Sequence, residues 1–138
     1  MSYVVKMMSQ ADGEKLYAKI GRWLGSPTVR RECGGYPLND GETYIWLVAM
    51  NKRDLTPCGF ISFEHGACVV LHHGYVDPAH RSKGVFGELL RQCLAYADHH
   101  HLSISTTQQG KSSEALAKHG FAEVGRRGAW IKLERSAK

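Results

Sequence analysis

The sequence lacks a long apolar run, and no segment approaches the roughly 20 apolar residues that a membrane-spanning helix needs. The N-terminal segment 1–6, Met-Ser-Tyr-Val-Val-Lys, also lacks the apolar core and the small-residue cleavage site of a signal peptide. These absences argue against a membrane partner, and we expect the protein to be cytoplasmic.

Cysteine is scarce, and basic residues form no dense cluster. The four cysteines contain no Cys-x-x-Cys pair, which argues against a zinc ribbon or a thioredoxin motif and favours free thiols. The net charge of +5 suits an anionic ligand and is compatible with RNA or DNA, but no basic run is dense enough for a nucleic-acid arm. Because 138 residues are too few for two hydrophobic cores, we expect one domain over residues 1–138.

Apolar periodicity and turn residues predict alternating strands and helices. One helix follows Ser9 as its N-cap and ends at Gly25-Ser26-Pro27, the best amphipathic helix opens at Val85 and ends near residues 98–101, and a short helix at 112–119 ends at Gly120. Strands are expected at 3–8, 44–50, 58–64, 68–76, 102–106, 121–124 and 129–133, with a short helix and a loop within 28–42. Short turns between the three central strands imply antiparallel pairing, so the fold class is α/β with a mixed sheet.

A polar turn with two glycines, residues 81–87 (Arg-Ser-Lys-Gly-Val-Phe-Gly), joins a strand end to the best helix. Such a turn directs several backbone N–H groups to one point, where the helix dipole adds partial positive charge. Gly84 and Gly87 let an anion approach the backbone, and Arg81 and Lys83 add full charges. The pattern predicts a phosphate or pyrophosphate site, although it is neither a Walker A loop nor a dinucleotide fingerprint.

This segment resembles the acyl-CoA loop of the GNAT acetyltransferase family, whose pattern is Arg/Gln-x-x-Gly-x-Gly/Ala followed by a leucine pair. Arg81, Gly84 and the pair Leu89-Leu90 fall in register, and the preceding segment 75–78 is similar to the family's Val-x-Pro entry. Phe86 departs from the pattern, because the family usually has Gly or Ala at that place.

A second motif supports the resemblance over nearly the whole chain. Residues 114–121 are similar to the family's short helix that ends in Gly-Phe, after which a strand closes the sheet. The resemblance implies the GNAT fold, with a mixed, mostly antiparallel sheet of six to seven strands and about four helices.

The resemblance also implies a function, namely transfer of an acetyl or other acyl group from acetyl-CoA to an amine acceptor. It places the CoA contacts on one strand end, on the loop and on two serines of the short helix: Gly74, Tyr75, Val76, Arg81, Ser82, Lys83, Gly84, Val85, Phe86, Gly87, Ser112 and Ser113. Capping of the short helix is the simpler role for the two serines. The oligomeric state is not determined by the sequence, which is compatible with both a monomer and a homodimer.

Acyl transfer needs a base, and the strand before the loop supplies candidates. Strand alternation sends His72 and His73 to opposite faces, and His72 shares parity with Gly74 and Val76. We therefore expect His72 to act as the base and His73 to contribute mainly to stability, while Glu64 at the end of the preceding strand is the second candidate.

The general acid is not evident from the sequence. The family often has a Tyr before Gly-Phe, and the matching residue is Leu116, so water, Tyr75 or Tyr36 remain as proton donors. His99-His100-His101 suggests a metal, but consecutive helical side chains diverge, so we expect no metal site.

The acceptor is also open. Its expected surface between the first helices and the central strands includes Trp23, Arg30, Arg31, Glu32, Tyr36 and Asp40. Because the charges are mixed, they do not identify the amine, and small amines, amino acids, a protein N-terminus or lysine, and an aminoacyl or nucleobase group all remain open. The alternatives are a CoA-binding module without activity, suggested by Leu116, and a protein associated with nucleic acid, suggested by the net charge.

Overall fold

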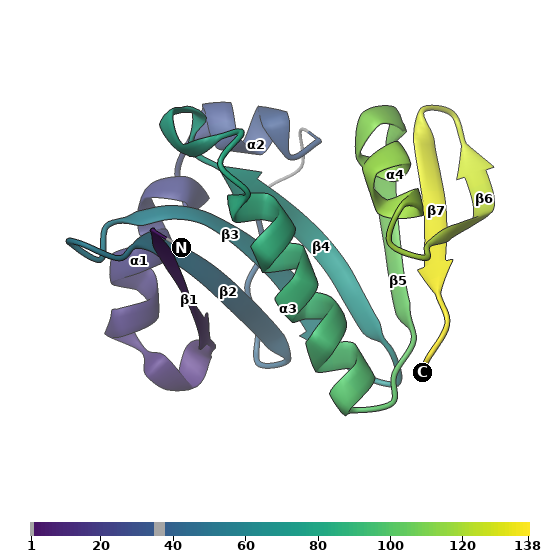
Figure 1. Cartoon of the computed structure of the whole chain (residues 1–138), viewed down its shortest axis with the longest axis horizontal. Coiled ribbons are helices and arrows are strands. Elements are labelled where there is room, and N and C mark those ends of the chain that lie inside the picture. The colour runs from purple at the N-terminus through teal and green to yellow at the C-terminus, as the bar shows by residue number, and fades with distance from the viewer. Residues whose placement is uncertain (1, 35–37) are drawn as a thin grey trace.

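The computed structural model describes residues 2–34 and 38–138 and shows a seven-stranded sheet with helices on both faces (Figure 1). Its strands lie in the order β1-β2-β3-β4-β5-β7-β6. They are β1 (Tyr3–Met8), β2 (Tyr44–Asn51), β3 (Pro57–His65), β4 (Val69–Val76), β5 (Ile104–Gln109), β6 (Ala122–Arg127) and β7 (Trp130–Arg135). All neighbouring pairs are antiparallel except β4 and β5. The predicted mixed, mostly antiparallel α/β fold is therefore confirmed.

Helices cover the two faces of the sheet with separate hydrophobic clusters. They are α1 (Glu14–Leu24), α2 (Pro27–Glu32), α3 (Val85–His99) and α4 (Gly110–Ala117), with short 3-10 helices η1 (Gln10–Asp12) and η2 (Pro78–His80). Leu16, Ile20 and Trp23 of α1 pack on one face, and Leu89 and Leu90 of α3 pack on the other. In the described part of the chain, no helix has both the length and the apolar character to cross a membrane.

The first helices differ from the prediction at their starts. Ser9 caps η1 rather than α1, because its Oγ accepts the N–H of Ala11, and α1 begins only after Gly13. Ser26 and Pro27, expected only as a stop signal, also start α2, where Ser26 Oγ accepts the N–H of Val29 at 3.2 Å. Proline at the first helical position costs no hydrogen bond, since that N–H has no partner within the helix.

The last elements are displaced from their predicted bounds. β5 extends to Gln109 and α4 begins at Gly110, so Ser112 and Ser113 lie inside the helix and do not cap it. Ser113 Oγ instead donates to the carbonyl of Gly110 at 2.7 Å. β6 begins one residue later than expected and runs to Arg127.

Strands β4 and β5 separate along their length, which leaves an opening in the middle of the sheet. They pair only at Val69–Ile104, Val70–Ser105 and Leu71–Thr106. Beyond Leu71, β4 continues against β3 alone, and beyond Thr106, β5 continues against β7 alone. Figure 1 shows the two strands diverging toward the end that carries α2 and the start of α3.

Candidate active site

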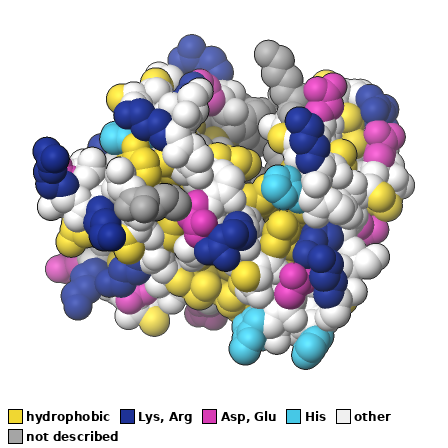
Figure 2. Space-filling view, in the orientation of Figure 1, with side chains coloured by type: hydrophobic (Ala, Val, Ile, Leu, Met, Phe, Trp, Pro, Cys, Tyr) yellow, Lys and Arg dark blue, Asp and Glu magenta, His cyan; other side chains and the backbone are white. Residues whose placement is uncertain are grey.

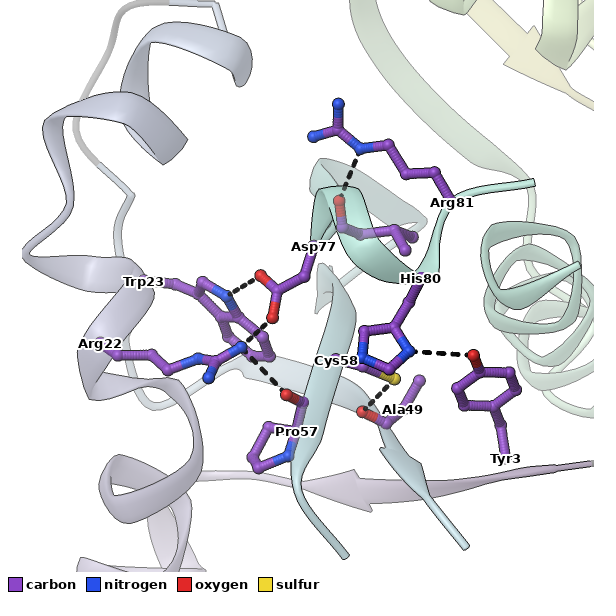
Figure 3. A network of polar contacts seen from close by, with 10 residues as sticks. Tyr3, Arg22, Trp23, Ala49, Pro57, Cys58, Asp77, His80 and Arg81 are labelled. Carbon is purple, nitrogen blue, oxygen red and sulfur yellow. Dashed lines mark hydrogen bonds and ion pairs between the residues drawn. The ribbon is translucent and has the colours of Figure 1, made fainter. Parts of the chain in front are cut away.

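The turn before α3 is fixed to the rest of the fold by a network of polar contacts (Figure 3). The carboxylate of Asp77 accepts from the indole N–H of Trp23 at 3.0 Å and pairs with Arg22, which also donates to the carbonyl of Pro57. On the other side, the hydroxyl of Tyr3 hydrogen-bonds Nδ1 of His80 at 2.9 Å. Helix α1 and strand β1 thus hold both ends of η2, and with it the turn that follows.

The turn opens α3 with the geometry of an anion site. Gly84 is the N-cap with φ +81° and Ser82 has φ +62°, so both lie in the left-handed region. The first helical N–H with a partner is that of Glu88, which bonds the carbonyl of Gly84 at 3.1 Å. The three preceding amides therefore have no partner within the helix and point with the helix dipole out of its N-terminus.

The side chain of Arg81 faces this site but is held by contacts with other residues of the protein. Its Nε donates to the carbonyl of Val76 at 2.8 Å, its Nη2 contacts Oε2 of Glu32 at 3.1 Å, and its guanidinium lies over the ring of Tyr75. Glu32 raises the pKa of Arg81 further above its usual value through this hydrogen bond. Arg81, which the sequence predicts to bind pyrophosphate, thus lies at the turn and already pairs with a carboxylate.

Three cavities meet at Gly74. The loop cavity, about 500 Å³, follows residues 81–87. The cleft cavity, about 520 Å³, fills the opening between β4 and β5, and the apolar cavity, about 260 Å³, lies between α3 and α4. Gly74 borders all three, and the loop cavity and the cleft cavity share this residue and Glu32.

Position 74 is crowded, because the side chain of Phe86 lies directly against it. A Cβ at residue 74 would be 2.6 Å from Cε1 of Phe86 and 3.2 Å from Cγ1 of Ile61. The Phe86 ring is 39% exposed and borders both the loop cavity and the apolar cavity. The departure from the family pattern at Phe86 therefore places a ring at the junction of the cavities.

We expect Gly74→Ala to lower the free energy of unfolding by about 1–3 kcal/mol, because the added methyl overlaps the Phe86 ring. Phe86→Ala should remove most of this cost in the double variant, which urea unfolding of all four proteins would measure as a coupling energy. Additive effects would show that the ring of Phe86 does not constrain position 74.

A β-bulge changes the orientation of the two histidines. Ser62 pairs with His73 and Phe63 pairs with Leu71, so His72 is an extra residue in β4. Leu71 and Val76 consequently pack in the same cluster beneath α3, although they are an odd number of positions apart. The prediction that His72 and His73 face opposite sides is wrong, because an inserted residue reverses the alternation and both line the cleft cavity.

His72 is held by its neighbours. Its Nε2 lies 3.2 Å from Oε1 of Glu64, and its ring stacks on Tyr44 with 4.8 Å between ring centroids. Thr43 donates to the other oxygen of Glu64, and these two hydrogen bonds keep the pKa of Glu64 below its usual value. Burial, together with the nearby His72, lowers the pKa of His73, so that ring is neutral near pH 7.

Three consecutive residues at the C-terminal end of α2 reach three walls of the site. Glu32 contacts Arg81 of the loop, the thiol of Cys33 lies 3.8 Å from the carbonyl of Gly74, and Gly34 lies against the ring of Trp130 at the start of β7. We call residues 32–34 the bridge. Burial, together with Glu32, raises the pKa of the Cys33 thiol to about 11, so this thiol stays protonated at neutral pH.

A family comparison agrees with this geometry. The model of the Acetyltransferase (GNAT) family matches residues 13–121, most of the chain. The chain belongs to the GNAT acetyltransferase family. Among curated proteins, none matches it in sequence.

Solved GNAT structures share the fold over nearly their whole length. An acyl-CoA N-acyltransferase from Pseudomonas aeruginosa has a TM-score of 0.75 and 21% identity, with 98% of this chain and 100% of that one covered. The ribosomal-protein-S18-alanine N-acetyltransferase from Escherichia coli has a TM-score of 0.72 and 14% identity, covering 99% and 94%. The PaiA N-acetyltransferase from Thermoplasma acidophilum, solved with coenzyme A, has a TM-score of 0.68 and 18% identity, covering 99% of both.

Most residues expected at the site line one of the three cavities. The loop cavity is lined by Gly74, Tyr75, Val76, Arg81, Ser82, Gly84, Val85, Phe86 and Gly87. Lys83 is exposed in the same turn, Ser112 borders the cleft and apolar cavities, and Ser113 lies apart from both. Tyr36 lies outside the described residues.

Other expected site residues take structural roles, and several lining residues were missed. Trp23 is only 2% exposed and bonds Asp77, so it offers no acceptor surface. Leu116 is buried beside the apolar cavity. The missed residues are Cys33, Gly34, Trp130 and the polar run 105–109 of β5. That run lacks apolar alternation, which is the signal that could have indicated a strand facing a cavity.

Charge is mixed on the face that carries α3. Figure 2 shows Lys and Arg side chains spread over this face with acidic side chains among them, and no continuous basic patch among the described residues there. The described part of the chain also contains no group of three His, Cys, Asp or Glu side chains arranged to hold a metal ion.

Proposed function

We propose that the protein transfers an acetyl group from acetyl-CoA directly to an amine acceptor. The observation that carries this proposal is the meeting of the loop and cleft cavities at Gly74, between an anion-binding helix N-terminus and two histidines. The CoA-bound structure of the PaiA enzyme, which has the same fold, supports CoA as the donor.

The loop would hold the CoA pyrophosphate. Free amides at the start of α3 and the helix dipole stabilise negative charge, and Arg81 adds a full positive charge. The pantetheine arm would then pass Gly74 into the opening of the sheet. Backbone groups of β4 that face the opening have no strand partner beyond Leu71, so they can hydrogen-bond the arm and the thioester.

His72 would take the proton from the amine. Glu64 is ionised and accepts a hydrogen bond from Nε2–H of His72, which leaves Nδ1 as the proton acceptor. The neutral amine then attacks the thioester carbonyl, a tetrahedral oxyanion forms, and the C–S bond breaks to release the CoA thiolate. Glu64 stabilises the imidazolium that results, as carboxylates do beside catalytic histidines.

Protonation of the thiolate has no dedicated side chain where the family usually has Tyr. Leu116 occupies that place and has no ionisable proton to donate, so we assign this step to water. The same feature favours the second candidate function, a GNAT module that binds CoA without transferring the acyl group.

A thiol-release assay with acetyl-CoA and a panel of amines separates the two functions. Transfer predicts CoA thiol release that depends on one class of amine and saturates with its concentration. The panel should contain monoamines, diamines, amino acids and peptides with a free N-terminus or lysine. Binding of CoA without release for any amine class would favour the non-catalytic module.

A further inference from the structure

Glu32 borders two cavities that receive different substrates in the proposed reaction. It lines the loop cavity beside Arg81, and it also lines the cleft cavity that contains His72 and His73. Among the described lining residues of the cleft, Glu32 is the only carboxylate, and neither Lys nor Arg lines it. This local balance is opposite to the net charge of +5 for the whole chain.

The contact between Glu32 and Arg81 can be broken at little cost. Their side chains are 42% and 44% exposed, and such half-exposed ion pairs are weak. Nε of Arg81 bonds the carbonyl of Val76 independently of Glu32. A pyrophosphate in the loop cavity would therefore compete with Glu32 only for the Nη2 end of the guanidinium.

We infer that Glu32 changes partners during the reaction, pairing with Arg81 in the free protein and with the cationic acceptor once CoA occupies the loop. This inference depends on the proposed function. Aliphatic amines are protonated near neutral pH, so the acceptor reaches the cleft as an ammonium ion and needs an anionic partner before His72 removes its proton. The favoured acceptor class is an amine with a second positive charge, which stays paired with Glu32 after the reacting amine has lost its proton. It has no carboxylate close to that charge, because no Lys or Arg is among the described lining residues of the cleft.

Two consequences follow from the exchange. CoA must displace Glu32 to bind the Nη2 end of Arg81, so Glu32 weakens CoA binding to the free protein. A carboxylate released by CoA then strengthens acceptor binding, and linkage requires the acceptor to strengthen CoA binding equally. The acceptor is thus expected to bind after CoA.

The test is calorimetric titration of CoA into the wild-type protein, Glu32→Gln and the control Glu123→Gln. Glu123 is matched because it pairs with Arg126 at 2.8 Å on β6, at the far edge of the sheet, and its loss changes the net charge equally. We expect Glu32→Gln to bind CoA about two- to fivefold more tightly than both other proteins. Equal or weaker binding by Glu32→Gln would overturn the exchange, whereas no binding by the wild-type protein would overturn the proposed function instead.

The acceptor half of the inference is tested with the amine that the wild-type protein uses best. At saturating acetyl-CoA, Glu32→Gln should raise KM for a diamine severalfold and leave kcat unchanged. The increase in KM should be smaller for a monoamine of equal length. A loss of kcat at unchanged KM, or equal effects on both amines, would contradict the assignment of Glu32 to the acceptor.

Discussion

Gly84→Glu is expected to abolish CoA binding while the fold persists. Residue 84 has φ +81°, where any residue other than glycine is strained by about 1–2 kcal/mol. A Cβ there would meet no atom within 4 Å, so the new carboxylate has room in the loop cavity. It would place a negative charge where the pyrophosphate is proposed to bind and would itself accept hydrogen bonds from the free amides of α3.

Calorimetry with CoA and thermal melting of the same samples measure the two effects separately. Gly84→Ala is the matched control, because it introduces the backbone strain without the charge. We expect Gly84→Ala to keep measurable affinity for CoA and Gly84→Glu to show none. A folded Gly84→Glu protein with wild-type affinity would mean that the pyrophosphate does not bind at this turn.

His72→Ala is expected to lower kcat about a hundredfold or more without changing CoA affinity, which is the usual effect of removing a general base. His72 contacts Glu64 and Tyr44 but lies away from the loop cavity, so the donor should still bind. The acid limb of the pH–rate profile should flatten, since it reports protonation of the base. Glu64→Gln should give a smaller loss, because the imidazole remains while its partner is neutral.

His73→Ala decides between the two histidines. The bulge puts both rings in the cleft, so a role for His73 in stability alone no longer follows from strand alternation. We expect this variant to keep the acid limb and most of kcat. If only His73→Ala flattens the acid limb of the pH–rate profile, His73 is the base. If only Glu64→Gln flattens it, the carboxylate of Glu64 is the base.

The sequence predicted those parts of the fold in which local patterns agree with tertiary packing. Apolar spacing on α3 and the short turns between β2, β3 and β4 were sufficient for the elements and their antiparallel pairing. β5 was predicted at 102–106 and ends three residues later, at Gln109, because residues 105–109 are polar and line a cavity. They therefore lack the apolar alternation of a half-buried strand.

The turn proposed to bind CoA could be located from the sequence because its residues are contiguous, whereas the rest of the candidate site depends on distant contacts. The bulge at His72 results from pairing with Ser62 and Phe63 on another strand, and no feature of β4 alone indicates it. The bridge joins residues 32–34 to the loop, to β4 and to β7, far along the chain. Such contacts are set by the assembled fold.

The most direct test of the CoA site is calorimetric titration of acetyl-CoA into the wild-type protein, with desulfo-CoA and adenosine as matched ligands. Anchoring by the pyrophosphate at residues 81–87 predicts one site per chain, similar affinity for acetyl-CoA and desulfo-CoA, and no detectable binding of adenosine, which lacks the pyrophosphate. A flat titration with both CoA compounds would contradict an acyl-CoA site at the start of α3.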